Sequence, residues 1–383
     1  MSTTTLTGPR LLIDGRWRDG AVTIRDGRIH AVLDAPPPEE DGATVERLDG
    51  GLLTAGLVDL QVNGSAGVDL AHADRAGWRR VAEHQARHGV TAFVPTFVTA
   101  PLERLAAAVG ATVDAALDLR DRRAAQALGA HLEGPFLSPS KPGAHPVDLL
   151  RLPEPAAVDA LLAGGTPLIV TVAPELDGAA ETIERLLAAG VHVSIGHSMA
   201  TAEQAAAAAD RGVRLVTHLF NAQRAFGHRE PGLPGRALVD ERLVSGLIAD
   251  RVHVADDALR LAFAAAAGRI ALVSDAVAAA GMAPGPFRLG PIEAVAVADG
   301  PPRLPDGTLA GSALHLDEAV RNVVALGVDP AVAIEAASAV PAAALGDDER
   351  GRLASGRRAD LVWWGDDLRV RAVWIGGERI DHG

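Results

Sequence analysis

The middle of the chain alternates short apolar runs with alanine-rich segments that have helical periodicity. Parallel strands need long crossovers, usually helices, so this alternation predicts repeated strand–helix units around a parallel sheet. Eight apolar runs occur, the number that closes a (β/α)8 barrel. The predicted strands are 56–62, 91–98, 127–133, 167–173, 191–197, 215–221, 244–250 and 269–275.

Helices are expected between these strands, and two more are expected after the last one. Longer, proline-rich loops follow the third and sixth strands. The predicted helices are 74–88, 102–119, 179–189, 202–211, 257–267, 312–326 and 331–345.

Both ends of the chain show short stretches of alternating apolar and polar residues, broken near the N-terminus by Asp-Gly pairs typical of hairpin turns. They predict one small β-sandwich domain, formed by residues 1–53 and 350–383, beside a barrel of residues 54–349. The proline-rich segment 36–40 is expected to be a surface loop of the small domain. The predicted fold class is therefore α/β, with an added β-domain.

The amino-acid composition limits which binding partners and which metal ligands are expected. A net charge of -13 argues against nucleic acid or an anionic membrane as the main partner, although a small anionic ligand remains compatible with it. There is no cysteine, so a metal would have only His, Asp and Glu ligands, and a cytoplasmic location is expected. No apolar run is long enough for a membrane helix, and the N-terminus lacks a signal-peptide pattern.

Polar residues stand where the predicted strands end, which is the face of such a barrel that carries active sites. An ionisable group at a buried strand end needs a partner or a metal. These residues are Gln61 and Asn63 at the end of the first strand, Glu133 at the end of the third, His197 of the fifth, His218 of the sixth and Asp275 of the eighth, with His253 following the seventh.

Glu133, His197 and His218 fit a catalytic metal, which takes about three protein ligands and leaves a position for water. Each residue alone could be a hydrogen-bonded residue at a strand end, but three on one barrel face favour a metal. Asp275 stands where an activated water needs a base, and its acid form could protonate a departing nitrogen. The alternative for Asp275 is to cap the following turn.

The sequence gives weaker support to candidate functional residues in loops. His145 could polarise a carbonyl and His253 could contact substrate, although lone loop histidines often do neither. Arg229, in the REPG segment, suits a phosphate or carboxylate; the alternative is a solvated surface arginine. Six other histidines have no such setting, and most are expected at solvent or on helix surfaces. They are His30, His72, His84, His88, His192 and His315.

Together these motifs resemble the N-acetylglucosamine-6-phosphate deacetylases of the amidohydrolase superfamily, along nearly the whole chain. The most specific are HLEGP at 131–135, GHS at 196–198, THLFNA at 217–222 and REPG at 229–232. Five further segments are similar to the family: residues 55–64, KPGAH at 141–145, IADRVHV at 248–254, VSDA at 273–276 and GTLAGSAL at 307–314.

The resemblance implies a TIM-like barrel of the amidohydrolase type and one divalent metal per subunit, zinc first, with iron, manganese or cobalt as alternatives. The metal would be held by Glu133, His197 and His218, with Asp275 as general base and acid. The first strand carries Gln61-Val62-Asn63 in place of the His-x-His that binds a second metal in many relatives. This indicates the single-metal arrangement.

The resemblance also implies a phosphorylated amino sugar as substrate and a homodimer. His145 would lie near the acetyl carbonyl, and Arg229 would reach the phosphate of the neighbouring active site. The expected substrate-binding residues are Gln61, Asn63, Asn221, Ala222, Arg229, His253 and Leu309.

The sequence departs from the family pattern at Gln223, where methionine is usual, at Arg251, where glycine is common, and in VSDA. None of these changes removes an expected ligand, but Arg251 would add a positive charge near the presumed phosphate site. The alternatives are another amidohydrolase, such as an N-acyl amino acid deacylase or a cyclic-amide hydrolase, and a catalytically silent barrel acting as an assembly partner.

Overall fold

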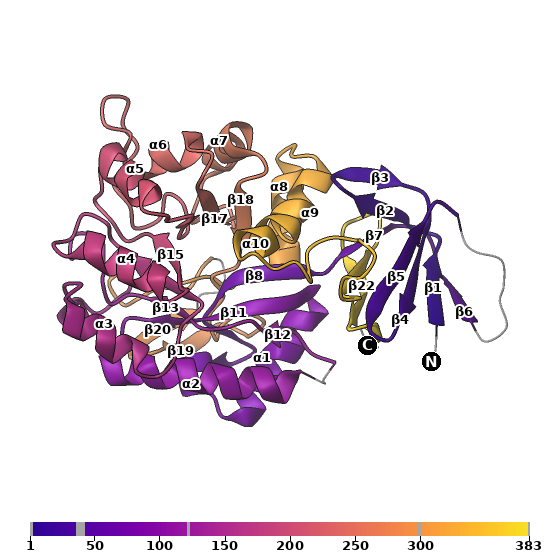
Figure 1. Cartoon of the computed structure of the whole chain (residues 1–383), viewed down its shortest axis with the longest axis horizontal. Helices are drawn as coiled ribbons and strands as arrows, with labels where there is room; N and C mark the ends of the chain where they lie inside the picture. Colours follow the sequence, from indigo (N-terminus) through magenta and orange to yellow (C-terminus); the bar gives the residue numbers. More distant parts are fainter. Residues whose placement is uncertain (1–2, 36–42, 121–122, 297–299, 382–383) are drawn as a thin grey trace.

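The computed structural model describes residues 3–35, 43–120, 123–296 and 300–381. Segment 36–40, expected to be a surface loop, lies outside the described residues. A barrel occupies one side of the molecule, and a smaller all-β part that contains both chain ends occupies the other (Figure 1). Within the described ranges, no helix combines the length and apolarity needed to cross a membrane.

Eight parallel strands form the barrel, as predicted. Neighbouring strands pair in chain order, and the first pairs with the second. The ring closes through a parallel bridge between Val62 and Ala276, where the Asn63 amide donates to the Ala276 carbonyl at 2.8 Å. The strands are β8 (Leu57–Val62), β11 (Val90–Val98), β13 (His131–Glu133), β14 (Ile169–Val172), β15 (His192–Ile195), β16 (Leu215–Val216), β17 (Val244–Ile248) and β18 (Ile270–Val273). A short strand, β12 (Gln126–Ala127), adds to β11.

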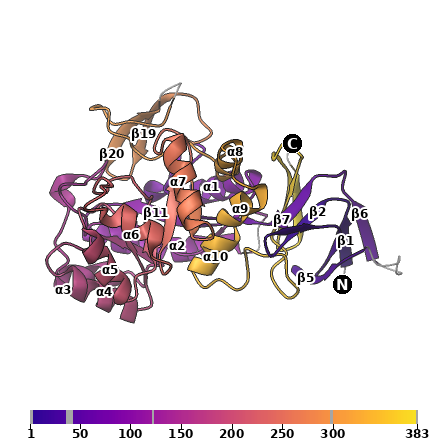
Figure 2. The same ribbon diagram turned by 90° about the horizontal axis from the view of Figure 1, so that it is seen from above.

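Helices pack around the barrel and bury its apolar strands (Figures 1 and 2). Capping residues determine where two of the helices begin. The Asp74 side chain accepts a hydrogen bond from the Gly77 amide at the start of the first helix, and Thr201 and Gln204 form a capping box at the start of another. The helices are α1 (Arg75–Arg87), α2 (Leu102–Leu119), α3 (Pro155–Leu162), α4 (Ala179–Ala188), α5 (Ala202–Asp210), α6 (Gly232–Val239), α7 (Asp256–Ala266), α8 (Leu316–Ala325), α9 (Pro330–Ala336) and α10 (Ala339–Ala344).

The predicted helices agree with this set, with two differences at the end of the chain. The helix expected from 312 begins only at Leu316, because Ser312 bridges to Ala276 of the barrel rim. The helix expected over 331–345 is two short helices. Helices α3 and α6 were not predicted, since prolines in both and glycines in α6 obscure the helical pattern.

An antiparallel hairpin, also not predicted, follows the eighth strand. Its strands β19 (Gly285–Leu289) and β20 (Ile292–Ala296) stand at one edge of the barrel (Figure 2). Leu289 and Ile292 pack with Val98 and Val277, so the hairpin is attached to the end of barrel strand β11 and to the segment that follows β18. A second small pair, β9 (Gly64–Ser65) and β10 (Val68–Asp69), follows the first barrel strand.

The two chain ends form two sheets that share an apolar core including Leu6, Val22, Leu53, Leu361 and Trp374. One sheet has the order β23-β22-β21-β7-β2-β3 and the other β5-β4-β1-β6. The predicted domain boundary at residue 53 falls within β7 and stays a prediction. The strands are β1 (Thr3–Thr7), β2 (Arg10–Ile13), β3 (Arg16–Arg18), β4 (Ala21–Arg25), β5 (Arg28–Leu33), β6 (Ala43–Arg47), β7 (Leu52–Ala55), β21 (Leu361–Trp364), β22 (Val370–Ile375) and β23 (Glu378–Asp381).

Candidate active site

Glu133, His197 and His218 meet at the C-terminal ends of three barrel strands. Glu133 is the last residue of β13, and the two histidines lie two residues beyond β15 and β16. Glu133 Oε1 is 3.1 Å from His197 Nε2 and 2.8 Å from His218 Nε2, and the two nitrogens are 3.1 Å apart. All three side chains are buried. The structure therefore brings together the three residues named from the sequence.

The hydrogen bonding of His197 fits a cation at this point. Its Nδ1–H donates to the Lys141 carbonyl at 2.9 Å, so the neutral ring carries a lone pair on Nε2. That lone pair faces the Glu133 carboxylate, and two acceptors at 3.1 Å repel each other unless a proton or a metal ion lies between them. Ligand atoms roughly 3.3 Å apart are expected around a tetrahedral metal ion with bonds of about 2.0–2.1 Å. The residues present therefore fit one divalent metal.

The backbone at the strand ends is unusual. His197, His218 and Asp275 have φ values of 47°, 29° and 50°, in the left-handed region that residues with a Cβ rarely adopt. Such conformations concentrate at functional sites, because surrounding structure must hold them in place. Gly143, from the KPGAH segment, packs against the His197 ring; a Cβ there would lie 3.0 Å from His197 Cε1.

Asp275 lies beyond β18 and faces the same centre. Its Oδ1 accepts hydrogen bonds from Gln61 Nε2 at 3.1 Å and from Asn63 Nδ2 at 2.8 Å. Burial and the negative charge of Glu133 raise the pKa of Asp275 to about 7. A carboxyl group with such a pKa can accept and return a proton near neutral pH.

His145 projects from the loop after β13 with a defined tautomer. The Thr99 backbone amide donates to His145 Nδ1 at 3.1 Å, so the neutral ring holds its proton on Nε2. Nε2 lies 3.8 Å from Glu133 Oε2, which places this N–H beside the Glu133–His197–His218 group. Burial lowers the pKa of His145 to about 3. His145 is therefore a neutral hydrogen-bond donor.

These groups open into a cavity of about 400 Å³. Gln61 is not at its surface but lies beneath it, holding Asp275. Arg229 is exposed and does not line the cavity of its own chain. The predicted residues that line the cavity are Asn63, Glu133, His145, His197, His218, Asn221, Ala222, His253, Asp275 and Leu309.

Two departures from the family pattern have structural explanations. Gln223 is buried and holds the loop after β16 through two hydrogen bonds. Its Oε1 accepts a hydrogen bond from the Phe220 amide, and its Nε2 donates one to the Thr217 carbonyl. Arg251 forms a two-pronged ion pair with Asp256 at 2.8 and 2.6 Å and does not line the cavity. The charge of Arg251 is therefore matched locally.

Sequence reasoning gave no role to Lys141, although it is the only lysine in the chain. Lys141 lines the cavity, and its carbonyl orients His197. A single lysine among 36 basic residues was a usable signal. Leu289 of the hairpin also lines the cavity, and no sequence pattern indicated that.

Known proteins are similar to this chain along nearly its whole length. The Amidohydrolase family profile matches residues 52–380. The N-acetylgalactosamine-6-phosphate deacetylase of Escherichia coli O157:H7 is 40% identical, covering 97% of this chain and 98% of its own. The N-acetylglucosamine-6-phosphate deacetylase of Homo sapiens is 39% identical, covering 98% and 93%.

A solved structure extends the similarity to three dimensions. It is a mutant N-acetyl-D-glucosamine-6-phosphate deacetylase from Mycobacterium smegmatis in complex with N-acetyl-D-glucosamine 6-phosphate. The two chains superpose with a TM-score of 0.92 at 35% identity, and each is covered completely.

Proposed function

The chain belongs to the amidohydrolase family, and from this premise we propose that it hydrolyses N-acetyl-D-glucosamine 6-phosphate to D-glucosamine 6-phosphate and acetate. The observation that carries the proposal is the convergence of Asp275, His145 and the Glu133–His197–His218 group on one cavity. The relatives' activities support the substrate class. The reaction would serve amino-sugar catabolism and cell-wall recycling.

Glu133, His197 and His218 would hold one divalent metal, for which zinc is our first choice. When bound, such an ion lowers the pKa of water and polarises the acetamide carbonyl. Glu133 supplies the single negative charge among these ligands. The Lys141 carbonyl fixes the tautomer of His197, so that Nε2 is presented as a ligand atom.

Asp275 acts as the base and then as the acid. As a carboxylate it takes a proton from the attacking water, and as a carboxylic acid it gives that proton to the departing amine nitrogen. Gln61 and Asn63 both donate to Oδ1, which leaves Oδ2 for the transferred proton.

His145 stabilises the oxygen of the tetrahedral intermediate. Its Nε2–H is fixed by the Thr99 amide at the opposite ring nitrogen, so the donor is already oriented before the substrate binds. Because burial keeps this imidazole neutral, it donates a hydrogen bond and does not surrender its proton.

The phosphate would be bound by residues of two subunits. Lys141 and His253 line the cavity of one chain. His253 Nδ1 is hydrogen-bonded to Asp250 at 2.6 Å, which leaves Nε2 for a ligand. The exposed Arg229 would come from the partner in a homodimer, where its two-pronged donor suits phosphate. Asn221, Ala222 and Leu309 would surround the sugar.

N-acetyl-D-galactosamine 6-phosphate is a second candidate substrate, because a relative at 40% identity is named for that activity. Both epimers carry the same acetamide and phosphate, so the chemistry above applies to either one. The cytoplasmic location also stays a prediction.

Acetate release from four sugars tests the proposal: both N-acetylhexosamines, each with and without the 6-phosphate. We expect kcat/KM to be highest for a phosphorylated sugar, with N-acetylglucosamine 6-phosphate ahead of its galacto epimer. The reverse order would transfer the assignment to the second candidate. Activity confined to N-acyl amino acids or cyclic amides would favour the other amidohydrolases, and inertness toward all of these compounds would favour the silent barrel.

A further inference from the structure

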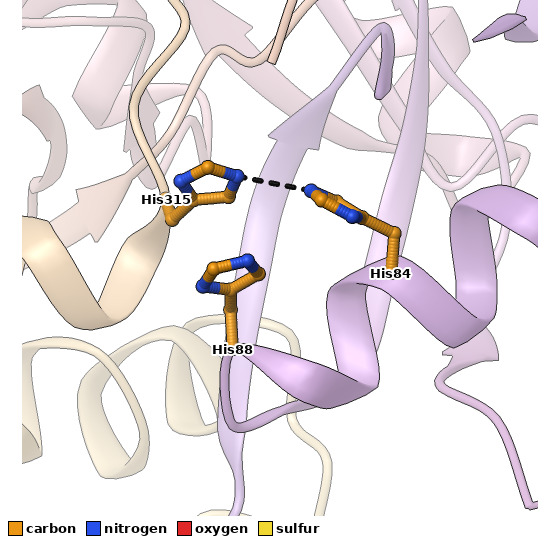
Figure 3. Close-up of side chains that lie close together, drawn as sticks. All are labelled: His84, His88 and His315. Atoms are coloured by element: carbon orange, nitrogen blue, oxygen red, sulfur yellow. Dashed lines mark hydrogen bonds between the residues drawn. The ribbon is translucent and has the colours of Figure 1, made fainter. Parts of the chain in front are cut away.

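Three histidines that sequence reasoning left at solvent or on helix surfaces gather outside the active site. His84 and His88 are one turn apart on α1, with His88 at its C-terminal cap, and His315 immediately precedes α8 (Figure 3). His84 Nε2 lies 2.9 Å from His315 Nε2, and the rings of His88 and His315 stack with centroids 3.7 Å apart. One nitrogen from each ring lies within 4.8 Å of the others.

Asp317 orients one of these rings. The His88 Nδ1–H donates to Asp317 Oδ1 at 3.0 Å, and the second carboxylate oxygen is held by Arg321 at 2.6 Å. In the neutral ring, this arrangement places the lone pair of His88 on Nε2. A carboxylate behind an imidazole is the usual support of a histidine that binds a metal.

Burial favours the neutral form of two of these imidazoles: it lowers the pKa of His84 to about 4 and that of His315 to about 3. Neutral imidazole is the form that binds metals. Gly281 packs against His84, and a Cβ there would lie 2.5 Å from His84 Cε1. All three histidines are only partly buried, so an ion can reach them from solvent.

We propose that His84, His88 and His315 form a second metal site, separate from the catalytic one, that takes a transition-metal dication such as zinc. Imidazole ligands favour this class of metal over magnesium or calcium. The site would join α1, which follows the first barrel strand, to α8, which follows the last one. A bound ion would therefore strengthen the closure of the barrel.

Binding requires a small rearrangement of the rings. Nitrogen ligands of tetrahedral zinc lie roughly 3.3 Å apart, and their lone pairs point at the same ion. The rings of His88 and His315 are stacked nearly parallel, so their lone pairs do not point at one position. Rotation of His315 out of the stack would break its hydrogen bond to His84 and turn both Nε2 atoms toward the ion. His88 can stay in place, held by Asp317.

Calorimetric titration of tag-free, metal-depleted protein with ZnCl₂ tests this site, which does not depend on the proposed function. We expect two equivalents per chain for the wild type and one for H84Q/H315Q. The single variant His88→Gln removes one ligand and should weaken binding at this site at least tenfold. The variant His30→Gln, which changes an exposed histidine on β5, is the matched control and should bind two equivalents.

A second readout separates this site from the catalytic one. Zinc should raise the Tm of the wild type more than that of H84Q/H315Q, while zinc-replete H84Q/H315Q keeps its acetate release. His218→Gln should lose one equivalent and also the activity. Equal zinc stoichiometry in the wild type, H84Q/H315Q and His88→Gln, with all three folded by circular dichroism, would overturn the proposal.

Discussion

The Asn63 side chain donates a 2.8 Å hydrogen bond to Asp275 across the closure of the barrel, from the end of the first strand to the end of the last. Gln61 makes a second such bond to the same oxygen. Amide donors stabilise the carboxylate form, whereas burial and Glu133 favour the acid form. The residues that replace the two-histidine motif of many amidohydrolases thus set the orientation and the proton affinity of the proposed base.

Replacing Asp275 with asparagine should abolish most turnover and leave the metal bound. Asparagine cannot accept the proton from water, so we expect kcat to fall about 10²- to 10⁴-fold. Acetate release and metal content should be measured on the same preparation. Near-normal kcat would remove Asp275 from its role, and a loss of metal together with activity would make it a ligand.

Replacing Asn63 with alanine should move the acid limb of the kcat/KM profile to higher pH. The carboxylate of Asp275 loses a donor, its pKa rises further, and a larger fraction is protonated at any given pH. A pH profile from 5 to 9 measures the shift. An unchanged limb, or one moved to lower pH, would contradict the assignment of that limb to Asp275.

Replacing Arg229 with alanine should raise KM for the phosphorylated sugar much more than for the plain one. The lost contact is to phosphate, and a charge-assisted hydrogen bond contributes roughly 1.5–3 kcal/mol. The control is Arg260→Ala, which removes another exposed arginine, on α7. Equal effects on both sugars would reject a phosphate contact.

Mixing variants tests whether Arg229 acts across the dimer. In a heterodimer of Arg229→Ala and Asp275→Asn, one site has its own Asp275 and receives Arg229 from its partner. Activity at low substrate should therefore rise above the sum of the separate variants. If Arg229 serves its own chain, both sites are defective and mixing restores nothing.

Asp59 should make stability depend on pH. It is fully buried on β8, its Oδ2 has no hydrogen-bond partner among the described residues, and burial raises its pKa to about 6. A raised folded-state pKa means that stability is lost as pH rises toward and through that value. Relative to Asp59→Asn, the wild type should lose about 1 kcal/mol of unfolding free energy between pH 5 and pH 8. Urea unfolding at both pH values measures this, and a pH-independent difference would contradict it.

Sequence patterns located the barrel strands and the residues at their ends, because the spacing of apolar residues and the point where an apolar run stops can both be read from a short stretch of sequence. They could not reveal that Gln61 lies beneath Asp275, since that contact spans 214 positions. The hairpin β19–β20 was not predicted, because its stretch of alternating apolar and polar residues is short and follows the last expected strand. The sequence also could not show that His84, His88 and His315 lie together, because they come from segments distant in sequence.

Acetate release from N-acetyl-D-glucosamine 6-phosphate, measured before metal removal, after chelation and after zinc is restored, tests the central claim most directly. We predict one acetate per glucosamine 6-phosphate formed, loss of activity on chelation and recovery with zinc. Glu133→Gln, which removes the charged ligand, should show no recovery. Activity that survives complete metal removal, or recovery in Glu133→Gln equal to that of the wild type, would contradict the account.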